Sequence, residues 1–90
     1  MAIQNILISP KVEIALPGVL IDYLCKLAMS GEYSKQAIQT FLLAPGKLGG
    51  RSIQKILYVD KPHRVFGFEP VRCNLIVLNS GNNNQMILTD

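Results

Sequence analysis

The 90-residue sequence contains no tryptophan, one histidine and two cysteines, and only 17% of its residues are charged. Two cysteines are too few for the disulfide framework of a small secreted protein, and no signal-peptide pattern is visible. We therefore expect Cys25 and Cys73 to be reduced, shielded thiols of a cytoplasmic protein. These cysteines and the single histidine, His63, do not have the spacing of metal ligands, so we expect no metal or cofactor. No apolar run is long enough to cross a membrane.

Hydrophobic residues, in contrast, make up 49% of the chain. This content excludes a disordered chain and predicts one compact domain over residues 1–90. A chain this short has difficulty burying so much apolar surface, so a homo-oligomer is expected. An edge strand near the end of the chain is the candidate contact of a homodimer.

Positive charge is concentrated in the middle of the sequence. Residues 47–72 contain six cations and two acids, whereas the rest of the chain contains three cations and four acids. This asymmetry favours an anionic partner, which could be nucleic acid, a nucleotide or an acidic protein surface. A solvated pair of loops is the alternative interpretation. The candidate anion-binding residues are Lys47, Arg51, Lys55, Arg64 and Arg72.

Hydrophobic periodicity predicts an α+β fold in the order β-α-β-β-β-β-β, with one main helix packed on a mostly antiparallel sheet. The helix is expected at residues 17–30, with Pro17 in its first turn and Gly31 as a left-handed stop. The core-facing leucines of this helix are Leu20, Leu24 and Leu27.

The expected strands cover residues 3–8, 51–59, 65–68, 73–78 and 85–89, and the fourth is central because it is apolar on both faces. Residues 34–43 fit a helix or a strand. A strand is favoured because β-branched and aromatic residues end the segment and a turn at Pro45–Gly46 follows. Further turns are expected at residues 60–64 and 79–84.

The segment LLAPGKLGGRSIQ, residues 42–54, has the glycines and cations of a ligand loop. A phosphate-binding P-loop requires the GxxxxGK[ST] spacing between a strand and a helix. Here Gly46 and Gly50 are only four residues apart, Arg51 replaces the lysine, and a strand follows. We therefore expect a hairpin connection whose glycines supply positive φ. Lys47 and Arg51 can contact an anion there without defining a nucleotide pocket.

The segment RVFGFEPV has in part the pattern of the aromatic strand of RNA-recognition modules. The first strand carries no aromatic residue and the second helix of that fold is missing. Phe66 and Phe68 are two residues apart, so we expect both on one face of a strand and in the core.

A small ribonuclease is the enzymatic alternative. It would use His63 as a general base, with Arg64 and Arg72 holding the phosphodiester. An ordinary turn histidine is the competing interpretation. No serine or cysteine has a base at a recognisable spacing, so nucleophilic catalysis has no support.

Four segments in order, ALPGVLIDYLCKL, IQTFLL, SIQKILYVDKPHRVFGF and LIVLNSGNNNQMILTD, resemble an uncharacterised family of small proteins from low-GC Gram-positive bacteria and their phages. The resemblance covers the pattern of residues 12–90, although this chain lacks the tryptophan of the helix and is less acidic. It implies a compact bacterial or phage α+β domain that is not an enzyme, and no catalytic residue is carried over.

The sequence as a whole therefore predicts a non-enzymatic binding module. One form is an inhibitor or regulator that engages an anionic partner. The ribonuclease and a protein–protein assembly module acting through apolar surface are the alternatives.

Overall fold

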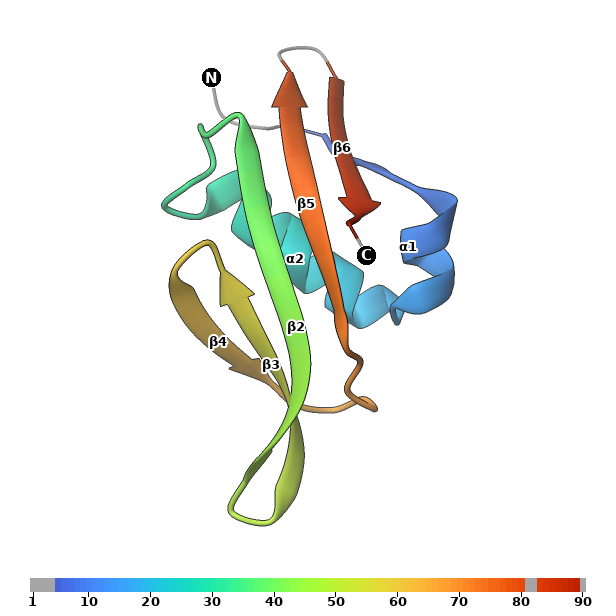
Figure 1. Ribbon diagram of the computed structural model, residues 1–90, viewed down its shortest axis with the longest axis vertical. Coiled ribbons are helices and arrows are strands. Elements are labelled where there is room, and N and C mark those ends of the chain that lie inside the picture. The colour runs from blue at the N-terminus through green and yellow to red at the C-terminus, as the bar shows by residue number, and fades with distance from the viewer. Residues whose placement is uncertain (1–4, 81–82, 90) are drawn as a thin grey trace.

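The computed structural model describes residues 5–80 and 83–89. The fold is α+β, with two helices and a six-stranded mixed sheet (Figure 1). The strands lie in the order β1-β6-β5-β2-β3-β4; β1 is parallel to β6, and the other neighbours are antiparallel. The elements are β1 (Leu7–Ile8), α1 (Pro10–Ala15), α2 (Gly18–Ser30), β2 (Ile38–Leu48), β3 (Arg51–Tyr58), β4 (Lys61–Val65), β5 (Cys73–Ser80) and β6 (Asn83–Leu88).

The predicted order β-α-β-β-β-β-β with one main helix is not confirmed, because the short helix α1 precedes α2. Pro10 does end the first strand, but it also occupies the first turn of α1. A proline is tolerated there because its missing N–H would have no partner inside the helix. The Ser9 hydroxyl accepts a hydrogen bond from the Val12 N–H at 3.4 Å and caps the helix. The predicted strand at residues 3–8 is seen only as β1, and residues 3–4 lie outside the described residues.

Helix α2 begins one residue later than predicted, with Pro17 at its N-cap and no side-chain cap. Its inner face is as expected, since Leu20 and Leu24 are fully buried and Leu27 is half-buried against the core. Gly31 is not left-handed, because its φ is −74°. A glycine is needed there for space. A Cβ at this position would lie 2.3 Å from the Leu27 carbonyl oxygen and 2.9 Å from the Tyr58 ring.

Strand β2 confirms the strand interpretation for residues 38–43, but the predicted turn at Pro45–Gly46 was wrong. Both residues lie within β2. The pairing with β5 ends at Leu43, so at Pro45 the strand has only β3 beside it and can lack one N–H on its free side. The turn is formed instead by Gly49 and Gly50, whose φ values are 59° and 81°. The glycine-based hairpin connection is therefore confirmed.

The predicted turn at residues 60–64 and strand at residues 65–68 were also wrong. β4 spans Lys61–Val65 and follows a two-residue turn in which Val59 has a φ of 57°. Pro62 suggested a turn, but β4 is the edge strand of the sheet, where a proline is tolerated. Phe66 and Phe68 follow the strand. Phe68 is half-buried on the core, whereas Phe66 is 42% exposed, so its placement in the core was wrong.

Strand β5 lies between β6 and β2, which confirms that residues 73–78 form an interior strand. The last predicted strand is present as β6, but β6 is not at the sheet edge because β1 pairs with it. The centre of the predicted turn at 79–84 lies outside the described residues, although Ser80 and Asn83 are paired at the strand ends.

Both helices lie on one face of the sheet (Figure 1). We call this the covered face and the opposite one the open face. Alternate residues of each strand point to the two faces. On β2, for example, Phe41 and Leu43 are buried on the covered face, whereas Leu42 points away from the helices and is 45% exposed.

A candidate anion-binding groove on the open face

The open face carries a series of large apolar side chains. Leu42 is opposite Leu57 on β3, and Ile76 is opposite Ile87 on β6. Four of the residues are well exposed: Leu7 at 63%, Ile38 at 54%, Leu42 at 45% and Leu57 at 37%. We call the whole set the apolar strip. Its members are Leu7, Ile38, Leu42, Leu57, Ile76, Leu78 and Ile87.

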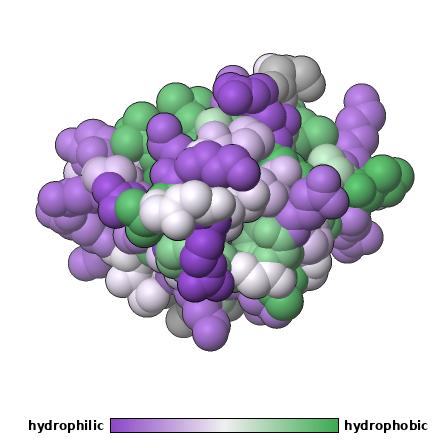
Figure 2. Space-filling model, turned by 90° about the horizontal axis from the view of Figure 1, so that it is seen from below, coloured by the Kyte–Doolittle hydropathy of each residue, from purple (hydrophilic) through white to green (hydrophobic). Residues whose placement is uncertain are grey.

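One end of the apolar strip opens into a groove of about 530 Å³, which we call the basic groove. Its apolar lining includes Leu42, Ala44, Leu57 and Pro62, from three neighbouring strands. Its cations are Lys55, Arg64 and Arg72, and all three side chains are exposed. Figure 2 views the molecule from the end where the β2–β3 hairpin projects and shows hydrophilic and hydrophobic side chains mixed on that end of the surface. The groove thus combines positive charge with apolar surface.

Two of these cations face each other directly. Lys55 on β3 is the cross-strand partner of Arg64 on β4, and Ala44 lies on the other side of Lys55. Like charges at directly opposite positions destabilise a sheet. The described residues form one ion pair, between Lys61 and Glu32. Lys55, Arg64 and Arg72 therefore have no acidic partner among the described residues. The pair therefore concentrates positive charge that the described chain does not neutralise.

A buried glutamine brings the third cation to the groove. Gln54 is 1% exposed, and its Oε1 accepts a hydrogen bond from the Val71 N–H at 2.7 Å. Its Nε2 donates to the carbonyl oxygens of Val71 at 3.0 Å, Lys55 at 3.1 Å and Ala44 at 3.3 Å. These bonds fix the connection between β4 and β5 against the β2–β3 hairpin, and Arg72 follows Val71 directly. Sequence reasoning missed Gln54, because alternation alone does not distinguish a buried polar residue from an exposed one.

The other two predicted anion-binding residues lie near the tip of the hairpin. Lys47 donates a hydrogen bond from Nζ to the Ser52 hydroxyl at 3.4 Å. The Arg51 guanidinium lies over the Phe66 ring, 5.2 Å from its centroid. Neither residue lines the basic groove. The structure therefore brings together three of the five predicted cations and leaves two at the hairpin tip.

The residues of the ribonuclease alternative, His63, Arg64 and Arg72, all line the basic groove but do not point the same way. His63 is opposite Ile56 and faces the helices, and its Nδ1 lies 3.1 Å from the Tyr23 hydroxyl. Arg64, the next residue of β4, points to the open face beside Lys55. His63 is thus among the residues that line the basic groove with Arg64 and Arg72, but its ring is hydrogen-bonded on the helix side of β4, whereas Arg64 points to the open face.

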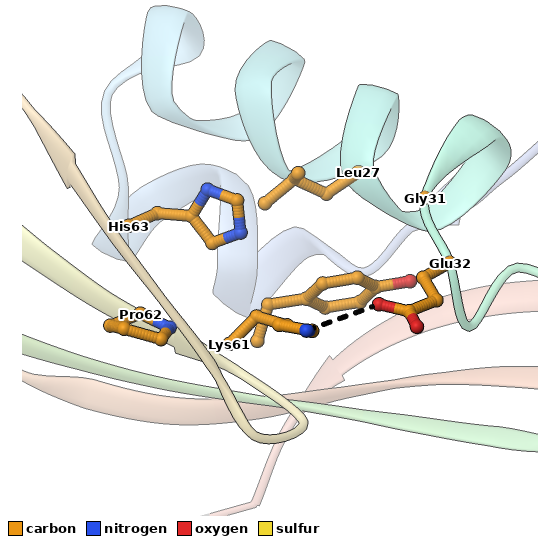
Figure 3. A pocket seen from close by; sticks show the side chains of 7 residues that line it. Leu27, Gly31, Glu32, Lys61, Pro62 and His63 are labelled. Atoms are coloured by element: carbon orange, nitrogen blue, oxygen red, sulfur yellow. Dashed lines mark ion pairs between the residues drawn. The ribbon is translucent and has the colours of Figure 1, made fainter.

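A second cavity, of about 290 Å³, lies between α2 and β4. Figure 3 shows Leu27, His63 and Gly31 around this cavity, with the Glu32–Lys61 ion pair of 3.5 Å at the side. Tyr58 also lines it. The cavity is mostly apolar, and its polar groups already have partners within the chain.

Two tyrosines beside this cavity join the end of α2 to the sheet. The Tyr58 hydroxyl donates to Gln39, whose Nε2 donates to the Ala28 carbonyl oxygen at 3.3 Å. The Tyr33 hydroxyl donates to Asp60 in the β3–β4 turn, and this hydrogen bond raises the pKa of Tyr33 to about 12. Burial raises the pKa of Tyr58. Both tyrosines therefore act as neutral donors, and we assign them a structural role.

The described residues contain no group of three or more histidine, cysteine or acidic side chains that could hold a metal. Both cysteines are thiols, but they are half-buried and so less shielded than predicted. Burial, followed by the nearby Asp22 charge, raises the pKa of the Cys25 thiol. No described helix is long and apolar enough to cross a membrane.

The basic groove and the apolar strip form one exposed surface with a charged part and an apolar part. Comparison with known proteins adds no assignment, since the chain matches no protein-family model, no curated protein and no solved structure.

Proposed function

We propose that the protein is a non-enzymatic binding module that engages an anionic partner through the basic groove. The observation that carries the proposal is the cross-strand Lys55–Arg64 pair, with Arg72 beside it and no acidic partner for any of the three among the described residues. An anion between these side chains replaces repulsion with charge-assisted hydrogen bonds. The pair therefore costs stability in the unbound chain and contributes to binding when an anion is present.

The apolar strip supports protein–protein assembly as a second candidate function. Monomeric soluble proteins rarely expose contiguous apolar patches unless the patch binds something. Leu42 and Leu57 belong to both the strip and the lining of the basic groove, so one partner could contact both. The two candidate functions therefore describe one surface rather than two.

The finer assignments remain predictions. A small module that covers a site on its partner would act as an inhibitor or regulator, which is the form we favour. The resemblance to the family of small bacterial and phage proteins, the cytoplasmic location and the homo-oligomer are further predictions.

The proposal is tested by measuring the affinity of the full chain for polyglutamate over a series of salt concentrations. A Lys55→Gln/Arg64→Gln variant should bind about tenfold more weakly or worse at low salt, since about 1.4 kcal/mol corresponds to tenfold. The difference should shrink as salt screens the charges. The matched control is Lys47→Gln/Arg51→Gln, which removes the same charge at the hairpin tip and should change affinity less than about twofold. Equal losses in both variants would show that only net charge matters and would contradict the basic groove.

A further inference from the structure

We infer that the anionic partner is a protein that presents an amphipathic helix to the open face. The apolar side of this helix would cover the apolar strip, and carboxylates at one end would enter the basic groove. The inference rests on the proposed function and adds the class of partner. It depends on the chemistry of the open face, on the hydrogen bonding of its strands and on its charge.

The apolar strip has the character of an uncovered packing surface. A sheet buries its apolar face against another layer, and in α+β folds that layer is made of helices. Here α1 and α2 supply the layer on the covered face only (Figure 1). On the open face, Ile38, Leu42 and Leu57 remain 37–54% exposed. A helix from another molecule would complete a second layer of the same kind.

The backbone explains why a helix fits this face better than an extended peptide. Strand β5 has a neighbour on both sides, and β5 and β3 lie on the two sides of β2 until the pairing with β5 ends at Leu43, so most backbone groups under the apolar strip are used within the sheet. An extended segment lying across the face would leave its own N–H and C=O groups without partners, whereas a helix satisfies them internally. The free edge at β4 is also a poor place for an added strand, because Pro62 interrupts it and charged side chains flank it.

Charge argues against a second copy of this chain as the occupant. None of the six strands contains an aspartate or a glutamate. The described acids lie in the helices, turns and connections, and Asp60 and Glu32 are already paired with Tyr33 and Lys61. A second copy placed face to face would bring no strand carboxylate to the basic groove. The complementary partner is therefore a different protein that carries its own acids.

The aromatic residues argue against single-stranded nucleic acid. Binding of this kind depends on aromatic side chains on which bases stack. The two aromatic residues of the strands, Phe41 and Tyr58, are at most 2% exposed on the covered face. Phe66 lies under the Arg51 guanidinium. The described part of the open face thus offers cations, aliphatic side chains and a few uncharged polar residues, Thr40, Asn74 and Gln85, but no aromatic residue of a strand.

The strip also sets the length of the partner helix. From Ile38 to Ala44, β2 covers about 20 Å at roughly 3.3 Å per residue. A helix of about 13 residues has the same length. Apolar residues spaced three and four apart over three turns, with acids gathered at one end, would match the strip and the basic groove.

The test is a selection of displayed random 16-residue peptides on the full wild-type chain. The enriched peptides should carry apolar residues at spacings of three and four with carboxylates at one end, and should gain helical circular dichroism on binding. Ile38→Ser/Leu42→Ser and Lys55→Gln/Arg64→Gln should each weaken their binding tenfold or more. The matched control for the apolar strip is Val19→Ser, because Val19 is an apolar residue on α2 that is 61% exposed. The matched control for the basic groove is Lys47→Gln/Arg51→Gln. Both controls should bind the peptides with wild-type affinity. Far-ultraviolet circular dichroism checks that each variant is folded.

Any of the following results would overturn the inference. One is enrichment of peptides with alternating apolar residues that bind in an extended form. Another is binding that the open-face variants leave unchanged. The third is a failure to enrich any peptide, or a single-stranded RNA that binds the basic groove more tightly than the selected peptides. Failure of the proposed function would give a different result: the affinity for polyglutamate would then be the same in the Lys55→Gln/Arg64→Gln variant and in the Lys47→Gln/Arg51→Gln control.

Discussion

The two faces of the sheet are formed by the same strands but differ in how much apolar surface they expose and in whether their polar groups have partners. On the covered face, Phe41, Leu75 and Met86 are at most 1% exposed, and the buried amides of Gln39 and Gln54 are hydrogen-bonded. On the open face, neighbouring residues of the same strands leave apolar side chains exposed and cations without acidic partners among the described residues. The covered face therefore supplies most of the packing that stabilises the fold, and the open face carries the surface to which we assign binding.

The largest effect should come from the covered face. Leu24→Ala removes a fully buried side chain of α2 and should lower the free energy of unfolding by about 2–5 kcal/mol through the cavity that it leaves. Leu42→Ala on the open face should change it by less than about 1 kcal/mol, since Leu42 is 45% exposed. Chemical denaturation of the two variants measures the difference. If both variants lost the same free energy of unfolding, the two faces would not differ in packing.

The next effect comes from the hydrogen bond between Tyr58 and Gln39. Tyr58→Phe leaves the Gln39 Oε1 buried without this donor and should cost about 1–3 kcal/mol in chemical denaturation. Tyr23→Phe, which removes the half-buried hydrogen bond to His63, serves as the control and should cost less. A loss with Tyr58→Phe no greater than with the control would argue against the buried polar pair as a source of stability.

On the open face, one substitution should raise the free energy of unfolding rather than lower it. Arg64→Gln relieves the repulsion with Lys55 and should raise the free energy of unfolding by about 0.2–1 kcal/mol at low salt. The gain should fall as salt screens the pair. Lys47→Gln at the hairpin tip is the control and should have no comparable effect. If Arg64→Gln destabilised the chain instead, Arg64 would have a structural role that the cross-strand register does not explain.

The smallest effect concerns alkaline pH. The hydrogen bond to Asp60 raises the pKa of Tyr33 from 10.0 to about 12, so the folded chain holds this proton more tightly than the unfolded chain does. The contribution of Tyr33 is therefore complete below pH 10 and is lost as the pH rises toward 12. Thermal unfolding of wild type and Tyr33→Phe should show a difference that narrows across this range. A difference independent of pH would contradict the assignment.

Local signals in the sequence were enough to predict α2, the interior strand β5 and the glycine turn of the β2–β3 hairpin. The misassignments at Pro45 and Pro62 have a common cause. A proline is compatible with a strand when one side of that strand has no neighbour, and this depends on sheet order rather than on nearby residues. Helix α1 was missed because Pro10 suggested only the end of a strand.

Composition located the positive segment but could not show which of its cations line the basic groove. Lys55 and Arg64 are opposite because a two-residue turn follows Tyr58, whereas the expected turn extended over residues 60–64 and so included Arg64 itself. Arg72 reaches the same groove through the buried Gln54, whose role depends on contacts 17 residues away in sequence. These positions depend on strand register and on tertiary hydrogen bonds, which cannot be predicted from the number of charges in a segment.

The central claim is tested most directly by a titration of ¹⁵N-labelled protein with hexaglutamate at low salt, followed by amide chemical shifts. If hexaglutamate binds in the basic groove, the largest chemical-shift changes should occur at amides around Leu42, Lys55, Arg64 and Arg72. The amides of Leu20 and Leu24 on α2 should barely move. Changes centred on the hairpin tip at Lys47 and Arg51, or spread evenly over all the cations, would contradict the claim.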